Sequence, residues 1–374
     1  MGARKTQSAI FWILLVLLAV GCRRAQPLYI GVVLDEDGAD AARLVQAELM
    51  RAGRLDGRPV RLWIVAPQAH RDSARLFAAL DSLAADSNVV AVVGPGNQGP
   101  SVAATRFLNE RGVPHVVPTP NGAERDTTGR FSFYLVADGG EEARLLAAQA
   151  VKLEPAGRMA VVHSDDDYGR SLRGLVVGEL TRQRARVVFE STFEPGADTA
   201  SLRALALAIE QANPDALIWL GRGRELWMIL PPVRAALPQL VVVGSDAVES
   251  ELLYRGGGEG LSGLLFVRFA DPQAEEARVA DFRLRYATWA ARQPTSRSML
   301  AYDAIHLVVA ALRSGARTRE EVREYLSSVG RTREAFTGLA GEVRFDERGR
   351  ATRPYLLGEV TDYGVQAVEP PATR

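Results

Sequence analysis

Residues 88–121 contain the pattern that most restricts the possible fold of this chain. Val89–Val93 is an apolar, β-branched run, which is typical of a strand buried on both faces of a parallel sheet. A glycine-rich loop follows, helical spacing begins at Val102, and a second short strand is expected at His115–Val117. Strand, loop, helix and strand in this order predict a parallel α/β sheet, whose ligands lie beyond the carboxyl ends of the strands.

The loops that follow these two strands are candidate ligand-binding segments. The first loop leads into a helix whose first amides have no partner within the helix, so they can bind a carboxylate or a phosphate. The second loop is short and polar. We therefore predict ligand contacts from both loops, at Gly96, Asn97, Gln98, Gly99, Thr119 and Asn121.

The first loop also matches the G-x-G-x-x-G pattern of dinucleotide-binding proteins. That pattern requires an acidic residue about 20 positions further on, at the end of the second strand, to bind a ribose. Here the second strand ends in Val117, Pro118 and Thr119, without an acid. The unit is also not the first of its kind in the chain. Nucleotide binding is therefore the weaker interpretation, and no cofactor is predicted.

The N-terminus has the features of a secretory signal. Arg4 and Lys5 form a short positive segment, and the apolar stretch Ala9–Val20 is too short to cross a bilayer, which takes about 20 residues. The next two residues, Gly21 and Cys22, resemble the end of a bacterial lipobox, in which the cysteine is lipidated and becomes the first mature residue. The leucine of this motif lies one place further upstream than usual.

Residues 1–21 are therefore predicted to be a lipoprotein signal peptide, and residues 22–27 a lipidated cysteine with a short tether. The five residues after Cys22 span about 17 Å when fully extended, so the folded part is expected close to a membrane surface. The protein is expected to be exported, on the periplasmic or extracellular face of a membrane, and held there by the lipid. Inner and outer membrane both remain open.

Composition argues against several classes of protein. The formal net charge is +0, with 45 Lys and Arg against 45 Asp and Glu, so there is no basic field suited to nucleic acid. Cys22 is the only cysteine, so no disulfide can form within the chain. The 4 histidines lack metal-ligand spacing, and no nucleophile-elbow motif is present. We therefore predict neither a metal site nor an enzyme.

The alternation of strand and helix patterns predicts two similar lobes. After the signal peptide about 350 residues remain, which is enough for two domains. Strands alternating with helices indicate parallel sheets with helices on both faces, and the pattern restarts near Phe131. One helix is expected from about Ala39 to Ala52, and a later helix is expected to be interrupted at Pro231 and Pro232.

Several segments resemble the periplasmic binding proteins of the branched-chain amino acid type, over about residues 28–368. AGRLDGRPVRLWIVAPQ resembles the family's turn into its second strand, and VVAVVGPGNQGPSVAATRFLNERGVPHVVPTPN resembles the first half of its ligand site. VVHSDDDYGRSL resembles the D-D-x-Y-G segment that opens the second half. The strand ends ANPDALIWLGRG and VVVGSDAV follow, and FTGLAGEVRFDERGRATRPY resembles the closing strand pair. The order and spacing of these segments make the resemblance specific.

The resemblance implies two α/β lobes joined by three hinge crossings, with a ligand held in the cleft between them. Each lobe would combine two stretches of the chain, residues 28–138 with 249–352 for lobe 1 and residues 139–248 with 353–368 for lobe 2. Residues 369–374 would form a tail. The crossings would lie near Asp138, near Gly244–Glu249 and near Thr352–Tyr355.

The resemblance also implies roles for individual residues. The loop after the central strand would bind a ligand carboxylate, with Gln98 where the family has a serine, and Thr119 and Asn121 would add contacts from the next loop. Tyr168 matches the tyrosine whose ring forms one wall of the site. Asp246 matches the acid that receives the ligand's ammonium group, since a buried cation has to be paired.

The sequence departs from the family's pattern in ways that affect specificity. The first loop consists only of Asp35–Gly38, which removes one wall of the pocket. Arg222 stands where these proteins often have tyrosine, and it is expected either to neutralise Asp246 or to bind a ligand carboxylate. Pro231 and Pro232 lie in a helix that the family keeps continuous. Branched-chain specificity is therefore not predicted, and the expected ligand is a small polar molecule.

The function that this resemblance implies is that of a solute-binding lipoprotein. It would capture an amino acid or a related compound for an ABC importer, with a membrane permease and an ATPase as partners, and is expected to be a monomer. Two alternatives remain open. One is a ligand-free envelope interaction protein, similar to the lipoprotein activators of peptidoglycan synthases, and the other is a ligand sensor subunit.

Overall fold

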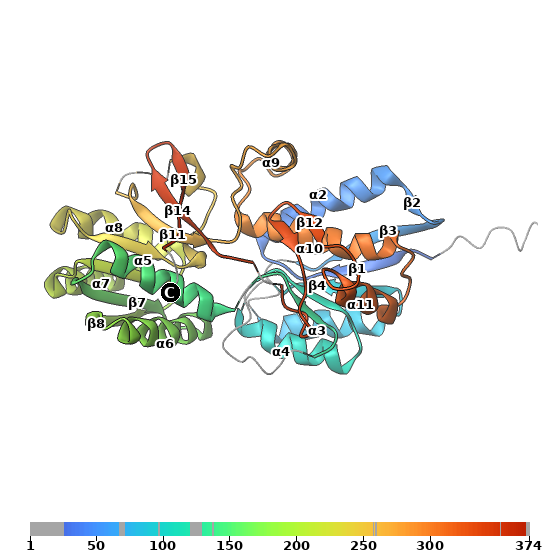
Figure 1. The fold of residues 1–374 in the computed structure, drawn as a ribbon, viewed down its shortest axis with the longest axis horizontal. Coiled ribbons are helices and arrows are strands. Elements are labelled where there is room, and N and C mark those ends of the chain that lie inside the picture. The colour runs from blue at the N-terminus through green and yellow to red at the C-terminus, as the bar shows by residue number, and fades with distance from the viewer. Residues whose placement is uncertain are drawn as a thin grey trace, which may run out of the picture.

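The computed structural model describes residues 26–66, 72–95, 98–119, 129–136, 138–256, 258, 260–351 and 353–371. The predicted signal peptide and Cys22 lie outside these ranges, as do Gly96, Asn97 and Asn121 of the candidate loops. The described residues form two lobes that lie side by side along the longest axis of the molecule (Figure 1). Within the described ranges, no helix combines the length and the hydropathy needed to cross a bilayer.

The first lobe is built on a six-stranded sheet in the order β2-β3-β1-β4-β5-β6. The strands are β1 (Leu28–Val32), β2 (Arg54–Leu55), β3 (Arg58–Ile64), β4 (Val89–Val93), β5 (His115–Val117) and β6 (Ser132–Tyr134). All neighbours pair in parallel except the edge strand β2, which is antiparallel to β3. All five residues of β4 are buried, as its apolar run predicts.

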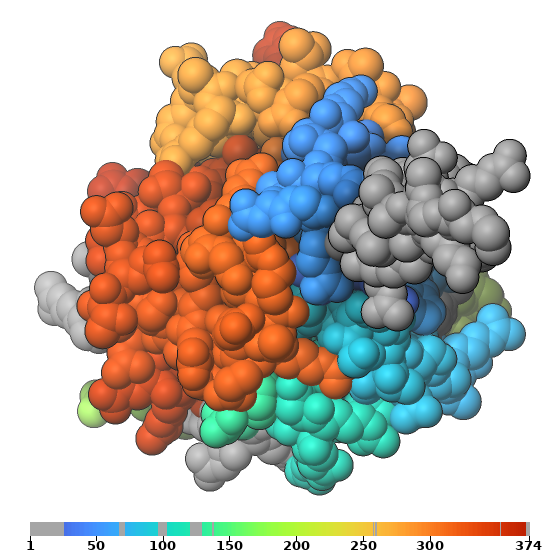
Figure 2. Space-filling view, turned by 90° about the vertical axis from the view of Figure 1, so that its right-hand side faces the viewer, coloured from blue at the N-terminus to red at the C-terminus, as the bar shows by residue number. Residues whose placement is uncertain are grey.

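Helices cover both faces of the first sheet. Buried side chains of α2 (Glu36–Ala52) and α10 (Ser296–Arg313) join one core with the sheet, and those of α3 (Ser73–Ala85) and α4 (Gln98–Glu110) join another. Two further helices, α9 (Ala277–Ala290) and α11 (Arg319–Ser328), and the hairpin of β12 (Phe336–Gly338) and β13 (Gly341–Val343) complete this lobe. Viewed from the outer end of the lobe, the late segments in orange lie beside the early segments in blue and cyan (Figure 2).

The second lobe is built on a seven-stranded sheet in the order β15-β14-β11-β10-β9-β7-β8. The strands are β7 (Arg158–Ser164), β8 (Arg186–Phe193), β9 (Ala216–Leu220), β10 (Val241–Gly244), β11 (Leu264–Arg268), β14 (Leu356–Thr361) and β15 (Gly364–Val368). The helices are α5 (Gly139–Leu153), α6 (Asp167–Arg182), α7 (Thr199–Ala212) and α8 (Gly223–Ala236), with short 3₁₀ turns η2 (Asp246–Val248) and η3 (Leu253–Arg255). Strands β7 to β11 are parallel, and β14 and β15 close the sheet in antiparallel fashion. The predicted fold class is therefore confirmed.

The predicted division of the chain between the lobes is wrong for β11. The prediction assigned residues 249–352 to the first lobe, but β11 pairs in parallel with β10 and belongs to the second sheet. The second crossing therefore lies after Arg268 and not at Gly244–Glu249. The other two crossings lie between β6 and α5, at Asp138, and between β13 and β14, close to the predicted positions.

The helix predicted to be interrupted at Pro231 and Pro232 is continuous. α8 runs through both prolines, with Ile229 and Leu230 buried in the core of the second lobe. A proline inside a helix costs about 3 kcal/mol. Burial of large apolar side chains contributes about 1.5–3 kcal/mol for each, so the packing of this face offsets the loss.

The first helix begins earlier than predicted. α2 starts at Glu36, so most of the predicted loop Asp35–Gly38 is its first turn. Asp35 is the N-cap residue, and its Oδ1 accepts the Gly38 amide at 3.0 Å. Because no apolar residue precedes Ala39, the sequence pattern did not indicate this turn, which the Asp35 cap helps to stabilise.

Candidate functional site

The candidate loops of the first lobe follow β4 and β5, as the sequence predicts. Gln98 and Gly99 are the first two residues of α4, where backbone amides have no partner within the helix. Thr119 follows β5 and is 6% exposed, and its Oγ1 has no hydrogen-bond partner among the described residues. Since an unpaired buried hydroxyl costs free energy, Thr119 is suited to bind a polar ligand atom.

His115 fixes the start of the loop that follows β4. The ring is fully buried, and its Nε2 hydrogen-bonds to the Gly94 carbonyl. Burial lowers the pKa of His115 to about 4, so the ring is neutral at neutral pH and Nε2 carries the donated proton. Gly94 has a φ of 97°, and a Cβ at this position would lie 1.9 Å from the Val33 carbonyl oxygen. Only glycine fits this position.

Tyr168 and Asp246, which the resemblance assigned to the site, contact each other directly. The Tyr168 hydroxyl donates to Asp246 Oδ1 at 2.7 Å. Asp166 caps α6 by accepting the Gly169 amide at 2.8 Å, and Ser164 donates to Asp166 at 2.9 Å, which fixes Tyr168 in the first turn. Burial and the nearby Asp246 carboxylate raise the pKa of Tyr168 well above its usual value, so the phenol remains a donor.

Glu142 of α5 joins this pair, although no sequence motif indicated it. Glu142 is fully buried, and its Oε1 accepts the Asp246 amide at 2.9 Å. Burial, followed by the charge of Asp246, raises the pKa of Glu142 well above its usual range. Glu142 therefore tends to keep its proton and can donate as well as accept. The available signal was its position, because Glu142 lies on the same helical stripe as the buried Gly139 and Leu146.

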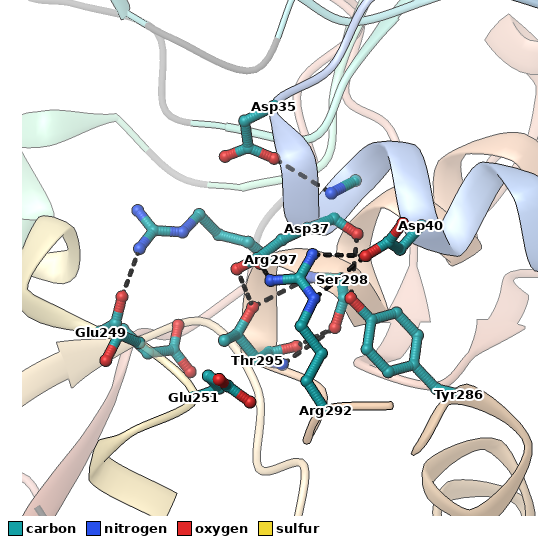
Figure 3. A network of polar contacts seen from close by, with 12 residues as sticks. Asp35, Asp37, Asp40, Glu249, Glu251, Tyr286, Arg292, Thr295, Arg297 and Ser298 are labelled. Carbon is teal, nitrogen blue, oxygen red and sulfur yellow. Dashed lines mark hydrogen bonds and ion pairs between the residues drawn. The ribbon is translucent and has the colours of Figure 1, made fainter. Parts of the chain in front are cut away.

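Arg297 bridges the two lobes at Asp246. It is the second residue of α10, in the first lobe, and its Nη1 lies 3.9 Å from Asp246 Oδ2. Its Nη2 donates to the Glu249 carbonyl at 2.6 Å (Figure 3). Burial opposes the charge, but the carboxylates of Asp246 and Asp35 raise the pKa of Arg297 above its usual value. Arg297 is thus a fixed cation, which no sequence motif indicated.

Glu249 is a second buried acid at this junction. Its Oε1 accepts the Ser296 amide at 2.8 Å, its Oε2 accepts the Ser296 hydroxyl, and the Tyr254 hydroxyl donates to Oε1. Glu249 is 3% exposed, so these donors hold it away from solvent. Because Ser296 begins α10, Glu249 ties the second lobe to the start of the helix that carries Arg297.

A network in the first lobe stabilises the first turn of α2 and the start of α10. Arg292 forms ion pairs with Asp37 and with Asp40, where Nη2 lies 2.6 Å from Oδ2. The Thr295 hydroxyl donates to Asp37 Oδ2 at 2.9 Å and also caps α10 (Figure 3). The first turn of α2 is therefore fixed by charge pairs, and Asp37 already has its own partners.

Arg222 is not the cation that lies beside Asp246. Arg222 is the exposed N-cap residue of α8, and its carbonyl accepts the Trp219 indole N–H at 3.1 Å. In the described part of the chain, Arg297 is the positive group within ion-pair distance of Asp246. The predicted neutralisation of Asp246 is thus made by a different arginine, and a ligand contact of Arg222 stays a prediction.

These groups are arranged for binding polar molecules. Thr119 and the first turn of α4 lie at the carboxyl ends of β5 and β4, and Tyr168 and Asp246 follow the carboxyl ends of β7 and β10. This is where open α/β sheets bind ligands. Across the described ranges, no group of three or more histidine, cysteine, aspartate or glutamate side chains is placed to hold a metal ion.

Two α/β lobes with polar residues at the carboxyl ends of both sheets define a class of two-lobed binding proteins. A family model described as "Periplasmic binding protein" matches residues 32–364. The chain therefore belongs to the periplasmic binding protein family, and its likeness is to the branched-chain amino acid type. The matched relatives are binding proteins by name, and none is named as an enzyme.

Individual relatives support the same family and fold. The Leu/Ile/Val-binding protein homolog 3 of Brucella melitensis is 25% identical over 191 residues, which are 50% of this chain and 51% of that protein. The chain thus matches about half the length of this relative. The substrate-binding protein LivJ of Streptococcus pneumoniae, solved with isoleucine, has a TM-score of 0.79 at 22% identity and covers 92% of this chain and 99% of its own. A solute-binding protein of Rhodopseudomonas palustris, solved with benzoate, has a TM-score of 0.77 at 16% identity, covering 92% and 96%.

Proposed function

We propose that this protein is an exported solute-binding lipoprotein, which captures a small polar ligand such as an amino acid or a related compound for an ABC importer. The observation that carries the proposal is the Arg297–Asp246 contact, because it shows that Asp246 of the second lobe faces the first lobe. We place the ligand between the lobes at this contact, with Tyr168 and Thr119 as further candidate ligand contacts.

The chemistry of this site fits a ligand that carries a carboxylate. The first turn of α4 supplies backbone amides that have no partner within the helix, and these favour negative charge at a helix N-terminus. The Thr119 hydroxyl adds a group without a described protein partner. On the opposite side, Tyr168, Asp246 and Arg297 provide further polar contacts, so both ends of a small polar molecule would find partners.

The relatives support this proposal by the ligands in their names. Leu/Ile/Val-binding proteins and LivJ with isoleucine are of the amino acid type, and the Rhodopseudomonas protein holds benzoate. These ligands differ in size and in the amino group, but each carries a carboxylate. We extend to this chain only that shared feature, together with transfer to a membrane permease and its ATPase. The predicted anchor is a lipid on Cys22.

A thermal-shift screen of residues 23–374 tests the proposal. Candidate ligands are amino acids, their amides and small carboxylic acids, and a ligand at 100 times its Kd should stabilise the fold by about 2.7 kcal/mol. For the best ligand, Tyr168→Phe should weaken binding about 5- to 10-fold, because Asp246 loses a hydrogen bond worth about 1 kcal/mol. Tyr363→Phe is the matched control, since Tyr363 is 96% exposed.

The same screen separates this proposal from the ligand-free alternative. Failure of every small solute to stabilise the protein would remove the importer role. Stabilisation by a cell-wall synthase instead of a solute would establish the envelope interaction role in its place.

A further inference from the structure

Arg297 lies beside Asp246, although the family resemblance did not indicate it. We propose that Arg297 is the built-in counterion of Asp246 and determines specificity, so that the cleft takes carboxylates that lack an ammonium group. This inference deepens the proposed function and rests on it.

The position expected to receive a ligand ammonium is already occupied. Tyr168 donates to one oxygen of Asp246 at 2.7 Å, and the Arg297 guanidinium lies 3.9 Å from the other oxygen. A ligand ammonium at Asp246 would stand beside this guanidinium, and two desolvated cations repel each other. An amino acid would therefore have to displace Arg297 before it could use Asp246.

Neighbouring acids do not provide a free second acceptor. The Glu249 carboxylate is satisfied by Ser296 and Tyr254, and Asp37 is paired with Arg292. Glu142 tends to keep its proton because it is fully buried. Among the described residues, the charge of Arg297 is thus balanced first by Asp246 and then by Asp35, which also caps α2 and has its own partners, so no strong acceptor is left for another cation.

The guanidinium of Arg297 still has donors to offer. Its Nε makes no hydrogen bond to the described residues, and Nη1 has only the 3.9 Å ion pair. A guanidinium presents five N–H donors in a planar fork that matches a carboxylate, and one Nη2 bond to the Glu249 carbonyl leaves most of them unused. The side chain is 20% exposed, so part of it borders solvent, whereas Nε is buried.

Arg297 is also held in place. It lies in the first turn of α10, which Thr295 and Ser298 close with a reciprocal capping box. The Thr295 hydroxyl also donates to Asp37, and Glu249 binds Ser296 from the other lobe. Because its backbone is fixed on both sides, removing the guanidinium from Asp246 would break the bond to the Glu249 carbonyl as well.

Ligand pairs that differ only in the amino group test this inference. We would measure calorimetric affinities of leucine against 4-methylpentanoate, phenylalanine against 3-phenylpropanoate, and glutamate against glutarate. The proteins are the wild type, Arg297→Met, which removes the charge at similar length, and Arg297→Lys, which keeps the charge without the fork. Arg313→Met is the control, because Arg313 is an exposed residue at the end of the same helix. Circular dichroism establishes that each variant is folded.

The wild type should bind the acid without the amino group at least about 10-fold more tightly in one pair or more. Arg297→Met should bind that acid about 30-fold more weakly or worse, because the substitution removes one member of a desolvated charge pair. The same variant should bind the amino acid more tightly than the wild type does. Arg297→Lys should fall between the two, and Arg313→Met should match the wild type.

Tighter binding of the amino acid in every pair by the wild type would overturn the inference while leaving the proposed function intact. If Arg297→Met leaves the ratio of the affinities for the acid and for the matching amino acid unchanged, the inference is overturned too. Binding of none of these compounds by either protein would reject the ligand class, whereas the proposed function would still be decided by the wider screen.

Discussion

Glu142→Gln should stabilise the protein, and the gain should grow with pH. Glu142 is fully buried, and burial followed by the charge of Asp246 raises its pKa well above the usual 4.5. Glutamine has the shape of the protonated acid. Its carbonyl can still accept the Asp246 amide, which lies 2.9 Å from Oε1, and its NH₂ replaces an oxygen that has no partner among the described residues.

The magnitude follows from proton binding. Above pH 4.5 the unfolded chain releases the Glu142 proton, whereas the folded chain keeps it until its raised pKa is reached. The unfolded state then binds fewer protons, so the stability of the wild type falls by about 1.4 kcal/mol for each pH unit in this window. The glutamine variant has no such proton. Between pH 5 and pH 7 its advantage should therefore grow by up to about 2.7 kcal/mol.

Urea unfolding at pH 5, 6 and 7 measures this difference directly, with the midpoint and the slope fitted separately. Titrating groups that do not interact with Glu142 act equally in both proteins and cancel in the comparison. Glu141→Gln is the control, because Glu141 is adjacent in α5 with a side chain 44% exposed, and it should show little change. A difference between wild type and Glu142→Gln that is the same at all three pH values would refute the reasoning, since Glu142 would then be ionised in the folded protein.

Three further predictions concern other buried or terminal groups. Glu249→Ala should lower the free energy of unfolding by about 3 kcal/mol or more, because it leaves donors of Ser296 and Tyr254 unsatisfied. The control Glu251→Ala removes a surface ion pair and should lower it by less than about 1 kcal/mol. Equal urea midpoints for the two variants would contradict this prediction. Burial lowers the pKa of His115 from 6.5 to about 4, so its neutral form stabilises the fold above pH 6.5. Up to about 3 kcal/mol of the free energy of unfolding is lost as pH falls toward 4. His115→Gln should remove that loss, and a variant that loses as much stability on acidification as the wild type would contradict this prediction. Cys22→Ser should abolish lipidation, so the variant should no longer fractionate with detergent-extracted membrane lipoproteins as the wild type does.

The fold was predictable where burial leaves a local pattern. Val89–Val93 indicated a central strand because a strand covered on both faces excludes polar residues, and β4 has that environment. Leu264–Arg268 is a similar, mostly apolar run, but a local pattern of this kind does not indicate which sheet the strand joins. The pairing of β11 with β10 is a tertiary choice. The continuity of α8 through Pro231 and Pro232 is likewise a tertiary effect. The prolines disfavour a helix locally, and the packing of its buried face maintains the helix.

The site was predictable only where a motif carried it. Tyr168 and Asp246 were found through a family resemblance, and in the structure the Tyr168 hydroxyl lies 2.7 Å from Asp246 Oδ1. Glu142, Glu249 and Arg297 were missed because a charged residue in a helix or loop normally indicates an exposed surface. Glu142 and Glu249 are buried, and Arg297 is mostly covered, because α5, the segment around η2 and α10 meet here although they are far apart in the sequence.

The split composition of the first lobe has a consequence for the order in which the chain folds. The strands β1 to β6 are complete by Tyr134, but α10, which covers one face of their sheet, begins only at Ser296. During synthesis or passage through an export channel, the whole of the second sheet's parallel portion emerges in between. That portion can pair its own strands while one apolar face of the first sheet is covered only in part, by α2. The first lobe to begin therefore gains its full core only after the parallel strands of the second lobe have emerged, and slow emergence of residues 296–312 should prolong a state that is open to aggregation.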